Sequence, residues 1–161
     1  MFRLLSKSRL LSWRLNAYLP YVGAGIRVTR ISPDFQAIDV RMSLHKGNVN
    51  YVGTHFGGSL YSMTDPFFML MLMENLGNDY IVWDKAAHID FIAPGRGTVH
   101  ANFRMEKTEI ERVRQLAENG KPVLPEYTVN VIDDEGKTIA CVHKTLYVRR
   151  KKRTVPENQA S

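Results

Sequence analysis

The sequence predicts an α+β fold, in which an antiparallel sheet of about five to six strands wraps around one long, central, apolar helix. Segments with strand-like alternation lie on both sides of a helical segment near the middle of the chain. That helical segment is apolar on every side over residues 67–73, so other elements must enclose it. A sheet curled around the helix would bury these side chains.

The length of the chain favours a single domain. With 161 residues, it can bury one sizeable core but is short for two ordinary domains. We place the domain at residues 1–150. It includes an amphipathic helix at about residues 3–18, which ends before Pro20 and is followed by a linker over residues 21–25. Residues 151–161 form a basic and polar tail.

The strands are predicted from alternation and from turn signals. Residues 26–31 and 36–44 form two strands, and in the second Ile38, Val40 and Met42 would face the core. After the central helix, residues 80–83 and 88–92 form one bent strand or two pieces. Three further strands follow at residues 98–105, 127–133 and 137–148.

An inserted surface helix is predicted between the strands at residues 98–105 and 127–133. Ile110, Val113 and Ala117 recur there at helical spacing. Thr108, with Glu111 three residues later, fits a capping box that would start this helix.

Charge and cysteine content limit the classes of function. The net charge is +6, and residues 1–33 contain basic residues but no acid. That segment could be an amphipathic organelle-targeting peptide, but the interpretation as a helix laid against the domain is preferred, with a cytoplasmic location. Cys141 is the single cysteine, which excludes an intramolecular disulfide and fits a reducing compartment.

Membrane and nucleic-acid functions are not expected from this sequence. The strongest apolar run, residues 67–73, is far shorter than the roughly 20 residues needed to span a bilayer. Nucleic-acid binding would rest on charge alone, because the chain shows no recognition motif. His88, His100 and His143 lie in different strands without the spacing of metal ligands, so no metal site is predicted.

A glycine-rich loop leads into the central helix. Residues 46–58 are rich in Gly, Asn and Thr, and the start of a helix offers backbone N–H groups without partners. Such a place stabilises an anion, either a phosphate or the oxyanion that forms when a thioester carbonyl is attacked.

Residues 50–66 resemble the motif of the phenylacetate-pathway branch of the hotdog acyl-CoA thioesterases. That motif is Asn, two residues, Gly, a short gap, His-Gly-Gly, and an acid seven residues after the second Gly. The matching residues here are Asn50, Gly53, Gly57, Gly58 and Asp65. Residues 89–97 are similar to the second strand and turn of that family. Phe56 stands where the family has its histidine, with His55 one residue earlier, which suggests an uncharacterised, DUF4442-like branch.

The resemblance implies a hotdog fold and a site between two subunits of a homodimer or homotetramer. Asp65 would be the general base or nucleophile, the N–H of Gly57 would hold the thioester oxygen, and Asn50 would orient substrate or water. The residues that would contact substrate are Gly58, His55, Phe56, Tyr61 and Arg96. No metal or cofactor is implied, because coenzyme A is part of the substrate.

Other interpretations of these residues remain open. Asp65 before Pro66 is also a good N-cap with proline in the first turn, and Asn50 is an ordinary turn residue. Arg96 and the basic run at residues 149–153 would bind coenzyme A phosphates or simply be solvated. The alternative function is a non-catalytic hotdog module that binds acyl-CoA or a fatty acyl chain. Dehydration of a hydroxyacyl thioester would need a histidine, which His55 alone could supply.

Overall fold

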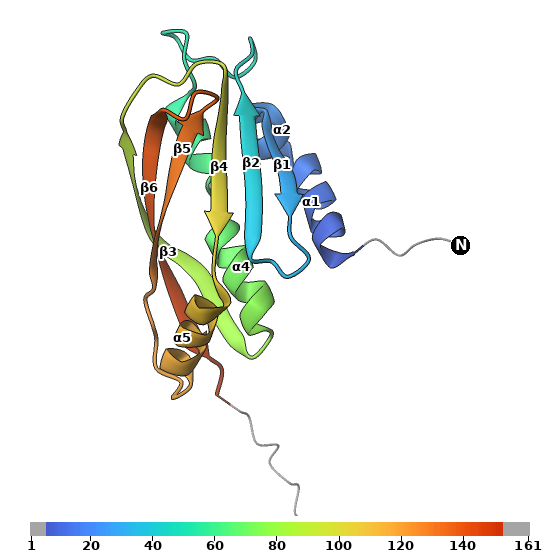
Figure 1. The fold of residues 1–161 in the computed structure, drawn as a ribbon, viewed down its shortest axis with the longest axis vertical. Helices are drawn as coiled ribbons and strands as arrows, with labels where there is room; N and C mark the ends of the chain where they lie inside the picture. Colours follow the sequence, from blue (N-terminus) through green and yellow to red (C-terminus); the bar gives the residue numbers. More distant parts are fainter. Residues whose placement is uncertain (1–5, 153–161) are drawn as a thin grey trace, which may run out of the picture.

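The computed structural model describes residues 6–152, which form one antiparallel sheet with helices against it (Figure 1). The sheet has six strands in the order β1-β2-β4-β5-β6-β3. The strands are β1 (Ile26–Ile31), β2 (Ala37–Ser43), β3 (Tyr80–Phe91), β4 (Thr98–Arg104), β5 (Glu126–Asp133) and β6 (Thr138–Arg150). The helices are α1 (Lys7–Ala17), α2 (Leu19–Ala24), α3 (Gly57–Ser62), α4 (Phe67–Leu76) and α5 (Lys107–Ala117).

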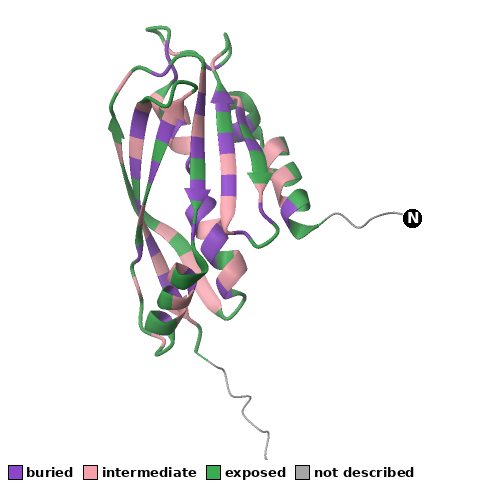
Figure 2. Ribbon diagram, in the orientation of Figure 1, coloured by how far each residue is buried: buried purple, intermediate pink, exposed green. Residues whose placement is uncertain are grey.

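The core lies between α4 and the inner face of the sheet. Buried and exposed residues alternate along β2 and β4, as the period of a half-buried strand requires (Figure 2). The ring of Phe67 packs on that of Phe103, with centroids 4.9 Å apart. The predicted α+β fold around an apolar helix is therefore confirmed. Met73, however, is 44% exposed, so one chain does not enclose α4 on every side.

The central helical segment is two helices rather than one. α3 ends at Ser62 and α4 begins at Phe67, with Pro66 between them. Proline has no N–H to donate and its ring clashes with the preceding turn, so the helix cannot run through it. The carbonyl of Asp65, which is left outside both helices, accepts a hydrogen bond from the Tyr21 hydroxyl.

The predicted linker over residues 21–25 is wrong, because α2 occupies most of it. Pro20 lies in the first turn of α2, where a missing N–H leaves no hydrogen bond unmade. α1 is tied to β1 by Asn16, whose side chain both donates to and accepts from the backbone of Val28, at 3.0 and 2.8 Å. Both N-terminal helices therefore pack against the domain, and residues 3–5 of the predicted helix lie outside the described residues.

The inserted helix is present as α5, but its predicted capping box is wrong. The helix begins at Lys107 with Glu106 as its N-cap, so Thr108 is already inside the first turn. Its hydroxyl instead donates to the Glu106 carboxylate at 3.3 Å. Ile110, Val113 and Ala117 form the buried face, as their spacing predicts.

β3 is one continuous strand and forms an edge of the sheet. It pairs with β6 along its whole length, with one irregularity between Asp84 and Ala86. Its other side has no strand partner among the described residues. Most of its side chains are exposed or half-buried (Figure 2). No helix within residues 6–152 is long and apolar enough to cross a bilayer.

Candidate active site

Asn50 folds the glycine-rich loop into a tight turn. Its carboxamide oxygen accepts from the N–H groups of Val52 and Thr54 at 3.1 and 3.0 Å. Its amide nitrogen donates to the Thr54 hydroxyl at 2.9 Å and to the His55 carbonyl at 3.1 Å. All of its hydrogen-bonding capacity is used inside the loop. This arrangement favours the interpretation of Asn50 as a turn residue over a role in orienting substrate.

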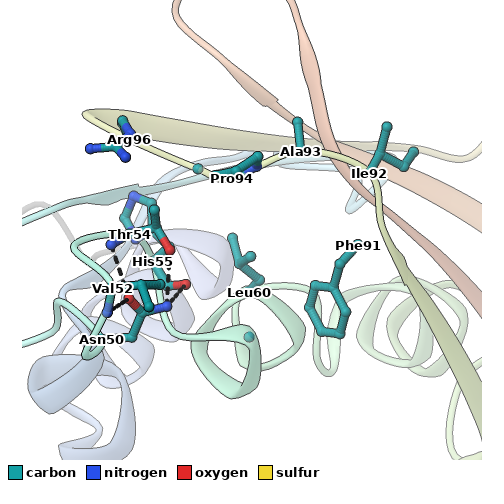
Figure 3. Close-up of a pocket in the computed structure, with 12 residues that line it drawn as sticks. Asn50, Val52, Thr54, His55, Leu60, Phe91, Ile92, Ala93, Pro94 and Arg96 are labelled. Atoms are coloured by element: carbon teal, nitrogen blue, oxygen red, sulfur yellow. Dashed lines mark hydrogen bonds between the residues drawn. The ribbon is translucent and has the colours of Figure 1, made fainter.

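A cavity of about 560 Å³ lies between this loop and the turn from β3 to β4 (Figure 3). It is lined by Asn50, Val52, Thr54, His55, Gly57, Leu60, Phe91, Ile92, Ala93, Pro94, Gly95 and Arg96. A Cβ on Gly57 would lie 2.9 Å from the Phe91 ring, so glycine lets this ring approach the backbone. The N–H groups of Gly57 and Gly58 have no acceptor in the described part of the chain. They remain available to a ligand oxygen.

His55 joins the loop to the turn between β3 and β4. Its backbone N–H donates to the Gly95 carbonyl at 3.0 Å, and its Nε2 lies 3.0 Å from the Gly97 carbonyl. The side chain is 3% exposed, and burial lowers the pKa of His55; the Gly97 carbonyl opposes this shift and His45 adds to it. Because a carbonyl can only accept, Nε2 carries the proton and Nδ1 is bare and without a partner in residues 6–152.

We expect His55 to make folding stability fall in mild acid. Its folded pKa lies below the ordinary value of 6.5, so the stabilisation is complete above that pH and is lost as the pH falls through the folded pKa. His55→Gln keeps a donor for Gly97 but cannot titrate. Its melting temperature should therefore change less between pH 7 and pH 5 than that of the wild type, as measured by differential scanning calorimetry. Equal slopes for the two proteins would contradict this assignment.

Phe56 stands where the thioesterase motif that residues 50–66 resemble has a histidine, and its ring is exposed. It is the N-cap residue of α3 and is 58% exposed. Its ring covers Gly58, where an added Cβ would lie 2.4 Å from it. Phe56 lines a separate cavity of about 340 Å³ with Asn50 and Ser59, and does not line the cavity at Gly57.

Asp65 and Tyr61 line a different cavity, of about 510 Å³, between the N-terminal helices and the α3–α4 junction. Its lining residues are Arg14, Leu15, Tyr18, Pro20, Tyr21, Tyr61, Ser62, Asp65 and Pro66. Gly57 and Asp65 are eight positions apart in mostly helical chain, which separates them by on the order of 10 Å. Within one chain, the predicted oxyanion donor and the predicted base therefore lie in different cavities.

Asp65 is held by a buried lysine that the sequence analysis missed. Nζ of Lys144 donates to Oδ1 of Asp65 at 2.7 Å and to the Tyr61 hydroxyl at 3.3 Å. Lys144 is 1% exposed, whereas the Asp65 side chain is 44% exposed. Asp65 is therefore not a side-chain cap: the N-cap of α4 is Pro66, and no side chain caps that helix.

Asp84 of β3 is the third charged group of this cluster. Its Oδ1 lies 3.2 Å from Nζ of Lys144, an ion pair without hydrogen-bond geometry. Burial is the main reason that the pKa of Asp84 is raised; the neighbouring carboxylate of Asp65 adds to this shift, and Lys144 opposes it. Burial alone would lower the pKa of Lys144, but its bond to Asp65 and the charges of both carboxylates raise it.

The strand pattern does contain a signal for Lys144. It occupies an inward position of β6, between the buried residues Val142 and Leu146. A lysine in that register needs a buried counter-charge, because lysine is almost never fully buried unless it is paired. Only the structure shows that Asp65 and Asp84 supply it.

The remaining polar residues form separate surface groups. His88 pairs with Asp90 at 2.9 Å and His100 with Asp134 at 2.7 Å, both on exposed positions. Across residues 6–152, no group of three or more metal-ligating side chains is found. Arg96 lies near the Phe91 end of β3, whereas Arg150 pairs with Tyr80 at the other end. About ten residues of β6 separate these ends, roughly 33 Å, so one chain does not bring Arg96 and residues 149–152 of the basic run together. Residue 153 and the rest of the predicted tail lie outside the described residues.

A sheet wrapped around a central helical segment defines the hotdog class, and solved structures share this arrangement. A protein of unknown function from Pseudomonas aeruginosa, described as a probable thioesterase, has 18% identity and a TM-score of 0.74, over 89% of this chain and 93% of its own. A thioesterase from Haemophilus influenzae has 15% identity and a TM-score of 0.64, over 99% and 96%. A protein of unknown function from Chlorobaculum tepidum has 15% identity and a TM-score of 0.70, over 88% and 93%. The TM-scores show a common fold.

A match to the model of a protein family shows which family the chain belongs to. The model of the family described as "Domain of unknown function (DUF4442)" matches residues 7–148, most of the chain. The chain therefore belongs to the DUF4442 family. No curated protein matches the sequence.

Proposed function

We propose that this protein hydrolyses an acyl thioester and that its substrate is an acyl-CoA. The observation that carries the proposal is the environment of Asp65. Its half-exposed carboxylate lines a cavity and forms an ion pair with the buried ammonium of Lys144. A carboxylate with one oxygen anchored and its other side open to a ligand suits a general base or a nucleophile. Asp65 also stands at the position of the acid in the thioesterase-like motif.

As a base, Asp65 takes a proton from water while the hydroxide oxygen attacks the thioester carbonyl carbon. The N–H of Gly57, with that of Gly58, donates to the carbonyl oxygen as it becomes negative. Collapse of the tetrahedral intermediate breaks the carbon–sulfur bond, and the thiolate takes up the proton. The products are the carboxylic acid and free coenzyme A. As a nucleophile, Asp65 would form an acyl anhydride that water then hydrolyses to the same products.

We propose that two copies complete the site by pairing along β3. Phe91, at one end of β3, contacts Gly57, and Asp84, nearer the other end, contacts the Lys144 that holds Asp65. Antiparallel pairing of β3 with its copy would bring the Phe91 end of one chain toward the Tyr80 end of the second. The cavity at Gly57 would then approach Asp65 of the second copy. Pairing of two such dimers would give the homotetramer.

The second candidate is a module that binds acyl-CoA or a fatty acyl chain without turnover. The observation that favours it is Phe56, an exposed aromatic ring where the related motif has a histidine. A screen of acyl-CoA substrates of graded chain length, with release of free thiol measured, separates the two functions. Turnover of any substrate supports the enzyme, whereas calorimetric binding without thiol release supports the module.

Arg96 is proposed to bind phosphate groups of coenzyme A at the rim of the cavity near Gly57. Arg96→Gln should weaken acyl-CoA binding roughly tenfold and reduce its dependence on salt, with acyl preference unchanged. Titration calorimetry at two ionic strengths measures both quantities. Arg112→Gln is the matched control, because Arg112 pairs with Glu109 on the exposed side of α5. Identical affinities for wild type and Arg96→Gln would assign Arg96 to the solvated surface.

We place this reaction in the cytoplasm. Cys141 is a free thiol in the structure and fits a reducing compartment. Fractionation of cells that express the full chain tests the location.

A further inference from the structure

The cluster around Lys144 combines features that a purely structural ion pair does not need. Lys144 is buried and meets two carboxylates and one hydroxyl, which come from the α3–α4 junction, from β3 and from α3. A buried ion pair brings little net stability, because desolvation of the charges offsets their attraction. A well-packed apolar residue would hold the junction to the sheet equally well. The charge must therefore matter for the carboxylate that reaches the cavity.

We infer that Lys144 is a positioning residue: it orients the Asp65 carboxylate toward the cavity and places a positive charge beside it, and Asp84 is the second carboxylate that makes this cation necessary. This inference rests on the proposed function. It goes beyond it because no motif of the sequence includes either Lys144 or Asp84. The geometry supports the assignment, because the shortest bond of Nζ goes to Asp65, at 2.7 Å.

Two carboxylates share one ammonium in this cluster. Without Lys144, the carboxylates of Asp65 and Asp84 would repel each other, and one of them would take up a proton at higher pH. With Lys144, Asp84 is the more deeply buried of the two, with a side chain 19% exposed against 44% for Asp65. Burial is the main cause that raises the pKa of Asp84. Asp65 is therefore the carboxylate of the pair that is more open to a ligand.

Other charged and titratable groups also lie near this cluster. Tyr61 faces it from α3, Tyr21 and Arg14 approach from α2 and α1, and Tyr127 of β5 is opposite Lys144 in the sheet. Tyr21 donates to the backbone carbonyl of Asp65, and Tyr127 donates to Glu109 at 2.9 Å. Neither tyrosine hydroxyl bonds to the side-chain carboxylate of Asp65 or Asp84. Lys144 is thus the group whose removal should change the proton affinity of the pair.

The test compares the wild type with Lys144→Met and with Lys144→Met/Asp84→Asn. We expect Lys144→Met to lower kcat at least about tenfold and to shift the acid limb of the pH–rate profile upward by about one unit or more. Adding Asp84→Asn removes the repulsion and should shift the limb back. Arg104→Met is the matched control: it removes the 2.6 Å ion pair with Asp39 and should lower stability without moving the limb.

A second measurement makes the result independent of turnover. Carbon-13 NMR titration of the aspartate carboxyl groups, assigned with Asp65→Asn, follows Asp65 directly in each variant. A rise in the pH at which Asp65 takes up its proton in Lys144→Met, reversed by Asp84→Asn, supports the inference even if no thioester is hydrolysed. An unchanged titration overturns the inference and leaves the proposed function standing. If Lys144→Met does not fold, the double variant is compared with Asp84→Asn alone, because these differ only at residue 144.

Discussion

Replacing Asp65 with asparagine is expected to lower thioesterase turnover at least about a hundredfold. Asparagine has the same shape and still accepts a hydrogen bond from Lys144, but it cannot take a proton from water or attack a carbonyl carbon. Because Asp84 remains beside Lys144, the ammonium keeps a counter-charge. The cost in folding free energy should therefore stay at about 1–2 kcal/mol.

Asp39→Asn is the matched control for this change. Asp39 pairs with Arg104 at 2.6 Å on β2, away from both cavities, so its loss should affect stability but not turnover. Initial rates of coenzyme A release and thermal unfolding of each variant separate the two effects. A variant Asp65→Asn that melts several degrees lower yet keeps full specific activity would show that the carboxylate is structural.

The fold was predictable because its signals are local. Alternation over residues 36–44 and the continuous apolar run at residues 67–73 each limit the structure to few arrangements. The predictions from sequence were wrong where a contact between residues far apart in the chain decided the structure. Residues 21–25 resemble a linker in sequence, but residues 21–24 belong to α2, from which the Tyr21 hydroxyl reaches the Asp65 carbonyl across 44 positions.

The candidate site was predictable only in part, for the same reason. The loop residues Asn50, His55 and Gly57 are close in sequence, and the structure does gather them around one cavity. Asp65 was singled out from the motif, but its partner Lys144 lies 79 positions later, with no spacing rule to connect them. The position of Asp65 in a cavity separate from Gly57 also could not be predicted, because it depends on the break at Pro66.

A charge placed on the exposed edge of β3 is expected to prevent dimer formation. Ala86 lies near the middle of this edge strand and is exposed in the single chain. If two copies pair along β3, Ala86→Asp places a carboxylate from each copy near the two-fold axis. Charges on an edge strand oppose strand pairing, and two like charges repel. We expect the variant to sediment as a monomer at micromolar concentration.

Loss of the dimer should abolish activity, because neither chain alone brings Gly57 and Asp65 into one cavity. Turnover of Ala86→Asp should fall at least about a hundredfold, while its circular dichroism spectrum stays close to that of the wild type. Ala17→Asp is the matched control, since Ala17 is exposed at the end of α1, on the far side of the sheet from β3. It should remain dimeric and active. A monomeric Ala86→Asp with wild-type turnover would mean that each chain holds a complete site, and a monomeric wild type would remove the basis for pairing along β3.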